Sequence, residues 1–307
     1  MNSGNKGILN LGATCYLNSV VQCLSHLLFF HPLNNKLNET YKEENDETKI
    51  MKTWLNINKE IWDNKNNKPL NIKNFIMIFQ NCIINNNNYG FYSFNQNDVE
   101  EFLVILMDLL HNTIKEKCIL KSNKVSDKKW LSSFENDYSL IIENFYSQSK
   151  LTTKCNLCNY STNKFDPFFI YRLSADKDSI VDLLKEKFKR ENITDWKCDK
   201  CGKKNATNKE TLIKTSKFII IQLKIFNKHR KINKHIKYED ILYINDTNYK
   251  LIGLTIHNGG LGGGHYYSIC YNLLDKHWRV YNDSNVSNID ELEVFNKNPY
   301  CLFYKKI

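Results

Sequence analysis

A cysteine stands between a turn and a predicted helix in the stretch Gly7-Ile8-Leu9-Asn10-Leu11-Gly12-Ala13-Thr14-Cys15-Tyr16-Leu17-Asn18-Ser19. Apolar residues recur at helical spacing after it, which predicts a helix over residues 16–30. A thiol at the start of a helix meets the positive end of the helix dipole, and free backbone N–H groups there stabilise thiolate, the reactive form. An isolated cysteine is more often a buried packing residue. Cys15 is thus a candidate nucleophile whose role depends on its surroundings.

Asn10 lies on the approach to the same turn, five residues before Cys15. Its carboxamide can fold back toward the thiol and donate to the oxyanion that forms when a thiolate attacks a carbonyl carbon. One short stretch therefore offers both a nucleophile and a donor for the charge that its attack creates.

Glycines gather before one histidine in the segment Gly259-Gly260-Leu261-Gly262-Gly263-Gly264-His265. Such a segment lets a substrate backbone approach closely, and a strand predicted at His265–Tyr271 would hold His265 at its edge. The alternative is a long hairpin loop with an incidental histidine. His257, at the end of the preceding predicted strand, is a weaker candidate base.

Asn282 and Asp283 follow another predicted strand, His277–Tyr281. Antiparallel pairing of this strand with residues 266–271 would bring Asn282 back beside His265. A carboxamide there accepts from the imidazole and fixes its tautomer, which would complete a set of nucleophile, base and orienting residue. Alternatively, Asn282 and Asp283 are simple turn residues.

Four other cysteines form two CxxC pairs, Cys155-Asn156-Leu157-Cys158 and Cys198-Asp199-Lys200-Cys201. Four thiolates supplied in this way suit tetrahedral Zn²⁺ at about 2.3 Å per Zn–S bond, and a closed four-ligand site is structural rather than catalytic. Chance spacing and redox dithiols are the alternatives, but a thioredoxin-like pair would need a strand-to-helix junction, which neither pair shows. The remaining cysteines are predicted to be packing residues: Cys23, Cys82, Cys118, Cys270 and Cys301.

Predicted helices come first in the chain and predicted strands later. A second helix is expected from Val99 to about Ile114, with Asp98 as N-cap and Glu101 three residues on, and short β-branched or aromatic runs begin at Phe218. This order indicates an α+β fold with an antiparallel sheet. The 307 residues carry no internal repeat and no long linker, so a single composite unit is expected. Asn-rich stretches are predicted to be surface loops at 34–48, 63–74 and 85–88.

The chain has a net charge of +10, because 43 Lys and Arg residues, most of them Lys, stand against 33 Asp and Glu. The positive charges are spread along the chain, which argues against a nucleic-acid or anionic-membrane partner. The apolar run Val20–Phe30 is interrupted by polar residues and lacks a basic leader, so neither a signal peptide nor a membrane span is expected. Ten cysteines without a secretory signal point to a reducing compartment. We therefore expect an intracellular protein of the cytoplasm or nucleus, those of a host cell if the chain is viral.

The motifs together resemble those of the ubiquitin-specific proteases, which are cysteine deubiquitinases with a papain-like catalytic centre. Gly7–Ser19 is similar to the cysteine box of that family, and Gln96-Asn97-Asp98-Val99-Glu100-Glu101-Phe102-Leu103 resembles its glutamine/aspartate helix motif. Gly264-His265-Tyr266-Tyr267 and Trp278–Asp283 resemble its histidine box and the strand that closes its triad. The motifs occur in family order, from residue 7 to about residue 304.

This resemblance implies a papain-like cysteine protease fold in one catalytic domain over residues 1–307. Its parts would be a helical thumb at about 1–145, zinc-bearing β fingers at about 146–215 and an antiparallel β palm at about 216–307. One structural Zn²⁺ would be held in the fingers by both CxxC pairs, and no catalytic cofactor is implied.

The resemblance also implies catalytic roles. Cys15 would attack the carbonyl carbon after the terminal glycine of ubiquitin, and His265 would deprotonate the thiol and then protonate the leaving amine. Asn282, in place of the more usual Asp, would orient His265. Asn10 would hold the oxyanion with the backbone N–H of Cys15, and Asp283 matches an acidic neighbour that often supports this centre.

Three further residues match positions that handle the ubiquitin tail. Gln96 and Asp98 match residues that bind the extended tail, and Tyr266 would line the narrow tunnel that admits its paired glycines. For Asp98 the capping role is an additional possibility, compatible with tail binding.

Ubiquitin and ubiquitinated proteins are the implied partners of what we expect to be a monomer. Two other functions stay open: a catalytically dead ubiquitin-binding scaffold on the same fold, and a zinc-ribbon nucleic-acid module. The sequence also leaves open another ubiquitin-like modifier as the substrate.

Overall fold

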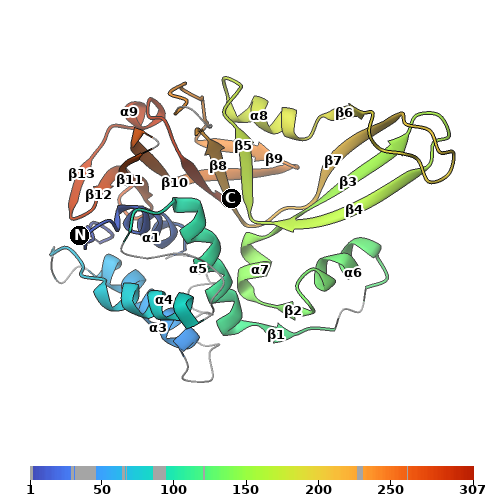
Figure 1. Ribbon diagram of the computed structural model, residues 1–307. Helices are drawn as coiled ribbons and strands as arrows, with labels where there is room; N and C mark the ends of the chain where they lie inside the picture. The colour runs from blue at the N-terminus through green and yellow to red at the C-terminus, as the bar shows by residue number, and fades with distance from the viewer. Residues whose placement is uncertain are drawn as a thin grey trace.

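The structure, a computed structural model, describes residues 3–28, 31, 46–63, 66, 68–85, 95–119, 122–226, 231–260 and 262–307. Within these residues helices dominate the first half of the chain and strands the second, as predicted (Figure 1). The helices are α1 (Cys15–Leu28), α3 (Asp46–Trp62), α4 (Lys73–Asn85), α5 (Val99–Ile114), α6 (Val125–Ser132), α7 (Leu140–Phe145), α8 (Ile180–Lys187) and α9 (Glu291–Phe295). None of the helices in the described part of the chain has the length and apolar character of a membrane span.

The predicted Asn-rich loops are described only in part. Residues 34–45, 64, 65, 67 and 86–88 lie outside the described residues. Of the remainder, residues 46–48, 73, 74 and 85 are helical rather than loop, because α3 and α4 extend into the Asn-rich stretches. Asparagine is only a moderately poor helix former, so a buried apolar face can carry a helix through such residues.

Helix α1 is buried along its whole length. It begins at Cys15, one residue before the predicted start, and residues 29 and 30 of the predicted helix lie outside the described residues. Its polar side chains have partners: Gln22 Nε2 donates to Lys6 O over 2.7 Å, and Ser25 Oγ accepts from Trp62 Nε1 over 3.0 Å. Buried polar groups require such bonds. Because α1 also packs on the large sheet, its N-terminus has a fixed position.

Helix α5 begins at Val99 as predicted. Asp98 is its N-cap, and Asp98 Oδ1 accepts from Glu100 N over 2.7 Å. This bond satisfies one of the backbone donors that the first helical turn leaves free. The cap fixes Asp98 at the point where α5 faces the large sheet.

The larger sheet, here called the palm sheet, has eight strands in the order β13-β12-β11-β10-β14-β8-β5, with β9 paired to β10 outside this path. Its pairs are antiparallel except β5 with β8. The strands are β5 (Ile170–Ser174), β8 (Phe218–Lys224), β9 (Ile241–Ile244), β10 (Thr247–Gly260), β11 (Gly263–Asn272), β12 (His277–Asn282), β13 (Asn285–Asn288) and β14 (Cys301–Lys306). In the view of Figure 1, α1 and α5 lie below these strands.

The pairing of β11 with β12 confirms the predicted hairpin. Ser268 lies opposite Tyr281, and Tyr271 lies opposite Trp278. The register returns the end of β12 to the start of β11, so the residues that follow Tyr281 come back to His265.

A smaller sheet, here called the finger sheet, has the order β4-β3-β7-β6 and projects away from the palm sheet (Figure 1). Its strands are β3 (Ser147–Cys155), β4 (Ser161–Phe168), β6 (Arg190–Ile193) and β7 (Ala206–Lys214). The two-residue strands β1 (Glu116–Lys117) and β2 (Asp137–Tyr138) pair separately beside α6. The α+β class is the one predicted.

The predicted finger range of about 146–215 contains elements that do not belong to the finger sheet. It contains β5 and α8, and β5 pairs with β8 of the palm sheet. The chain therefore leaves the finger sheet after β4, adds one palm strand and returns through β6.

Candidate active site

Cys15 is the first residue of α1, and only 6% of its surface is exposed. The turn before it is held by side chains: Thr14 N donates to Asn10 Oδ1 over 3.2 Å, and Leu11 N donates to Thr14 Oγ1 over 3.0 Å. Gly12 has a φ of 119°, a conformation that favours glycine. These local bonds determine where the helix begins and therefore where the thiol lies.

Burial raises the pKa of the Cys15 thiol, and the negative charge of Asp283 adds to the rise. Backbone N–H groups of Tyr266, Tyr16 and Cys15 itself act in the opposite direction. Desolvation outweighs these N–H groups, so the pKa of Cys15 is raised overall. The position at the helix start, taken alone, predicts the opposite, a stabilised thiolate. The resting thiol is therefore protonated, and a base must remove its proton when it attacks.

His265 lies near the start of β11, and its Nε2 atom is 2.6 Å from Asn282 Oδ1. An amide oxygen only accepts, so Nε2 carries the proton, and Nδ1 of the neutral ring is the basic nitrogen. The structure thus brings together two of the predicted site residues, in the relation that fixes the tautomer.

Asp283 is hydrogen-bonded mainly to the N-terminal segment. Its Oδ2 atom accepts from Asn10 Nδ2 over 2.9 Å, and its Oδ1 atom accepts from Asn18 Nδ2 over 2.8 Å. The distance from Asp283 Oδ2 to His265 Nε2 is 3.8 Å, too long for a hydrogen bond. Asp283 therefore orients the Asn10 carboxamide and acts on His265 only through its charge.

Asn18 is a site residue that the sequence patterns do not predict. Its amide also donates to Leu9 O over 3.3 Å, so it ties α1 to the segment before the turn. The available signal was helical spacing, since residue 18 is three positions after Cys15 and lies on the same face.

No hydrogen bond joins the Cys15 thiol to the His265 ring within the described residues. Their elements are connected by the packing of α1 on β11 and by the backbone N–H of Tyr266, which stabilises the Cys15 thiolate. The imidazole and its orienting amide are therefore assembled, while the thiol and the imidazole are not in hydrogen-bond contact. Such contacts are often long in an enzyme without substrate.

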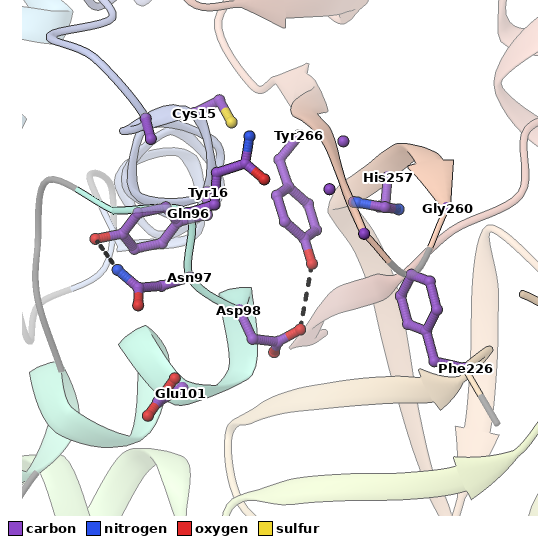
Figure 2. A pocket seen from close by; sticks show the side chains of 14 residues that line it. Cys15, Tyr16, Gln96, Asn97, Asp98, Glu101, Phe226, His257, Gly260 and Tyr266 are labelled. Carbon is purple, nitrogen blue, oxygen red and sulfur yellow. Dashed lines mark hydrogen bonds between the residues drawn. The ribbon is translucent and has the colours of Figure 1, made fainter. Parts of the chain in front are cut away.

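A cleft of about 500 Å³ leads to Cys15 and is lined by all three predicted tail-binding residues, Gln96, Asp98 and Tyr266 (Figure 2). Figure 2 shows Asp98 and Tyr266 joined across it, where Tyr266 Oη donates to Asp98 Oδ2 over 3.2 Å. Gln96 contacts the glycine-rich hairpin so closely that a Cβ added to Gly263 would lie 2.7 Å from its Oε1 atom. The cleft is therefore narrow at this point.

Both oxygens of Asp98 have partners, because Tyr300 Oη also donates to Oδ2, over 2.6 Å, while Oδ1 caps α5. Burial and the charge of Asp98 raise the pKa of both Tyr266 and Tyr300, so both hydroxyls stay protonated donors. Asp98 has the capping role and also forms a wall of the cleft. No sequence pattern identified Tyr300, which is far from Asp98 in the chain.

His257 lines the same cleft but has different partners from His265. Its ring packs between Phe226 and Tyr266, with centroids 5.2 Å and 4.6 Å away. Burial and the adjacent ammonium ion of Lys231 lower the pKa of His257 to about 4. Lys231 Nζ donates to its Nδ1 atom over 3.3 Å, so the lone pair that a base needs is already occupied. This environment favours His265 as the base.

The four predicted metal ligands meet at the tip of the finger sheet, and their sulfur atoms all lie within 4.8 Å of one another: Cys155, Cys158, Cys198 and Cys201. The Sγ atoms of Cys155 and Cys201 are 3.7 Å apart, and those of Cys158 and Cys198 are 3.5 Å apart. A tetrahedron with 2.3 Å metal–sulfur bonds has edges of about 3.8 Å, so the donor set fits one such ion.

Two similar turns present these sulfur atoms. Asn159 N donates to Cys155 O over 3.1 Å, and Gly202 N donates to Cys198 O over 2.8 Å, each at a residue with positive φ. Backbone N–H groups of Cys158 and Leu157 lower the pKa of Cys155 to about 6. The turn thus favours thiolate, the form that binds metal, at Cys155.

A model of the ubiquitin carboxyl-terminal hydrolase family matches residues 6–304. The chain belongs to this family. Similar members include ubiquitin carboxyl-terminal hydrolase Usp2 of Drosophila melanogaster, 27% identical over 98% of this chain, and human ubiquitin carboxyl-terminal hydrolase 2, 26% identical over 98%. The chain spans 34% of the fly protein and 55% of the human protein.

Solved structures with a similar fold include those of the SAGA DUB module, which contains Ubp8, Sgf11, Sus1 and Sgf73. The module bound to monoubiquitin matches with a TM-score of 0.79 and 24% identity, over 100% of this chain and 70% of the matched chain. The module bound to ubiquitin aldehyde matches equally well in TM-score, with 23% identity and the same two coverages. These matches confirm the predicted fold class, and the family match confirms the resemblance to ubiquitin-specific proteases.

Proposed function

We propose that this protein is a cysteine-type deubiquitinase, which hydrolyses the peptide or isopeptide bond after the C-terminal glycine of ubiquitin and releases ubiquitin from conjugates. The observation that carries the proposal is the 2.6 Å contact between His265 Nε2 and Asn282 Oδ1. It leaves Nδ1 as a base on the strand that packs against the helix of Cys15. Family membership supports the reaction class, and the ubiquitin-bound state of the SAGA module supports the substrate.

The proposed reaction begins when bound substrate brings His265 Nδ1 into contact with the Cys15 thiol. Nδ1 takes the thiol proton as sulfur attacks the carbonyl carbon, and the C–N bond then breaks as the imidazolium returns that proton to the leaving amine. His265 next removes a proton from water as its oxygen attacks the thioester carbon. The C–S bond then breaks as the imidazolium gives that proton to the Cys15 sulfur, which restores the thiol and releases the ubiquitin C-terminus as a carboxylic acid that loses its proton to solvent. Asn282 holds Nε2–H throughout.

Asn10 is the proposed donor to the oxyanion. One hydrogen of its Nδ2 group is directed to Asp283, which leaves the second for the developing charge, beside the backbone N–H of Cys15. Fixed donors of this kind act mainly in the transition state, and loss of one typically costs on the order of 100-fold in rate.

The cleft beside Cys15 is the proposed site of the ubiquitin tail. Its walls of Gln96, Asp98 and Tyr266 close on the glycine-rich hairpin, so a tail that ends in small residues fits and bulky side chains clash. A glycine tail approaches such walls closely because it has no Cβ.

One structural Zn²⁺ per chain is the proposed ion of the four-cysteine cluster, where it would crosslink the tip of the finger sheet. The protein is further proposed to act as a monomer without a catalytic cofactor, inside the cell, in the cytoplasm or nucleus.

Hydrolysis of a ubiquitin C-terminal fluorogenic amide by the wild type and by Cys15→Ala tests the proposal. We expect turnover by the wild type and none by the variant. The same assay with other ubiquitin-like modifiers tests the substrate, and faster turnover of one of these would replace ubiquitin in the proposal.

A catalytically inactive ubiquitin-binding scaffold is the second candidate, because the described residues show no thiol–imidazole hydrogen bond. The same assay separates the two. Ubiquitin binding without turnover by the wild type would identify the scaffold. Nucleic-acid binding without either activity would favour a zinc-ribbon module.

A further inference from the structure

The hairpin of β10 and β11 carries His265, and the outer edge of β10 loses its strand partner part-way along. Pairing of β10 with β14 ends at Thr255 opposite Cys301, and Tyr300 N donates to Thr255 O over 2.7 Å. Pairing of β10 with β11 continues five residues further, to Gly260 opposite Gly263. Beyond Thr255, β10 therefore has no strand on this edge within the described residues.

Carbonyl groups of alternate strand residues point to the same edge. The next two after Thr255 belong to His257 and Gly259. Lys231 Nζ donates to His257 O and, over 3.2 Å, to Gly259 O. Its third acceptor is His257 Nδ1, 3.3 Å away. An ammonium ion has three hydrogens, and here it occupies the place of the missing strand and satisfies two consecutive carbonyls on the open edge.

Lys231 is itself held in place. It pairs with Phe226 in an isolated antiparallel bridge, and the next residue, Ile232, donates its N–H to Ile225 O over 2.6 Å. Its ammonium group also lies 5.9 Å from the centroid of the Phe226 ring. The lysine is therefore a fixed support.

The hairpin needs such a support because its end is rich in glycine, which has many backbone conformations and no side chain to pack. His257, Asn258 and Gly259 lie opposite Tyr266, His265 and Gly264 in the register. A bond to His257 O or Gly259 O thus fixes the strand directly across from His265.

We propose that Lys231 is a positioning residue, whose ammonium ion replaces a missing strand on the outer edge of the β10–β11 hairpin and holds His265 and the cleft wall in place. Its effect on turnover rests on the proposed function, whereas its effect on the hairpin does not.

Two measurements test this inference on the full chain: backbone amide hydrogen exchange in the peptide that spans 257–264, and kcat and KM on the ubiquitin fluorogenic amide. The variants are Lys231→Met, Lys231→Arg and, as a matched control, Lys234→Met. Lys234 lies three residues on, and its ion-pair partner is the exposed Asp178, 2.7 Å away.

In Lys231→Met we expect faster exchange in 257–264 and a loss of about 10- to 100-fold in kcat/KM, with a fall in kcat because His265 is displaced in part of the population. Lys231→Arg should restore most of both values, since guanidinium donates to several acceptors. Lys234→Met should match the wild type. If Lys231→Met does not fold, Lys231→Gln, which keeps two donor hydrogens, replaces it and should give an intermediate loss.

Unchanged exchange and unchanged kcat/KM in the Lys231 variants would overturn the inference. A fall in kcat/KM with wild-type exchange would also overturn it, because Lys231 would then act by some route other than the hairpin. If the wild type itself lacks turnover, the proposed function fails, and the exchange rates alone decide whether Lys231 supports the hairpin.

Discussion

Asn10 Nδ2 lies 2.9 Å from Asp283 Oδ2, whereas His265 Nε2 lies 3.8 Å from the same oxygen. The carboxylate is therefore bonded to the candidate oxyanion donor and not to the imidazole. The charge of Asp283 also raises the pKa of Cys15, and it is the largest cause of the rise after burial. Asp283 thus favours the proposed reaction by orienting Asn10, and it opposes the reaction by making the Cys15 thiol harder to deprotonate.

Replacement of Asp283 by Ala should separate these effects. Without the acceptor, Asn10 loses its orientation, and kcat should fall on the order of 100-fold. Without the charge, the pKa of Cys15 should fall, so alkylation of the thiol by iodoacetamide should extend to lower pH. An unchanged kcat would show that Asp283 does not orient the oxyanion donor.

Asn282→Ala should lower kcat on the order of 100-fold, because Nε2–H of His265 loses its 2.6 Å acceptor and the ring can then turn so that Nε2 rather than Nδ1 faces the thiol. Asn282→Asp keeps an acceptor in place and should stay within about tenfold of the wild type. Steady-state kinetics on the ubiquitin amide measure both. Equal activity of Asn282→Ala and the wild type would remove Asn282 from the catalytic set.

Gly264→Ala should abolish most turnover for a steric reason. A Cβ at this position would lie 2.3 Å from Asn258 O and 2.5 Å from His257 Nε2, so the hairpin beside His265 must open. Gly260→Ala is the comparison in the same hairpin: Gly260 also lines the cleft, but no described atom lies within 4 Å of its added Cβ, so its loss of turnover should be smaller. Wild-type kcat/KM in Gly264→Ala would show that the hairpin tolerates displacement next to His265, the proposed base.

Local patterns in the sequence predict much of this site. The helix after Cys15, the cap at Asp98 and the return of Asn282 to His265 all follow from residues close together in the chain. Turn, helix and hairpin geometry fix such relations before tertiary packing does. The two CxxC pairs lie further apart, but ligand chemistry reveals their partnership without any knowledge of the fold.

Other features depend on contacts between distant segments, and no local pattern reports them. The upward shift in the pKa of Cys15 comes from burial, which the helix start does not reveal. Asp283 meets Asn10 across most of the chain, and Lys231 meets Gly259 across an open sheet edge. The parallel strand β5 within the predicted finger range is a fourth case, because only the completed sheet shows which strands pair.

Acid should destabilise the folded protein partly through His257. Its pKa in the fold, about 4, is below the value of about 6.5 expected in the unfolded chain, so the unfolded state binds more protons between these values. The free energy of unfolding should therefore fall as pH falls from about 6.5 to about 4. His257→Gln should show a smaller loss than the wild type in urea midpoints at pH 7.5 and 4.5. His235→Gln, at an exposed histidine, is the control, and equal losses in all three proteins would contradict the assignment.

Loss of the proposed Zn²⁺ should weaken the proposed binding of ubiquitin more than it changes the reactivity of the Cys15 thiol. In Cys198→Ser one of four sulfur ligands is gone, so zinc content should fall from about one per chain toward zero, and the tip of the finger sheet should loosen. The Kd for ubiquitin should rise, while the rate at which iodoacetamide alkylates Cys15 should change by less than about twofold. The cluster lies at the end of the finger sheet, whereas Cys15 begins α1, which packs on the palm sheet. Cys118→Ser, at a cysteine outside the cluster, controls for the loss of a thiol. A metal-free preparation of Cys198→Ser with wild-type affinity for ubiquitin would show that the ion does not support the fingers in binding.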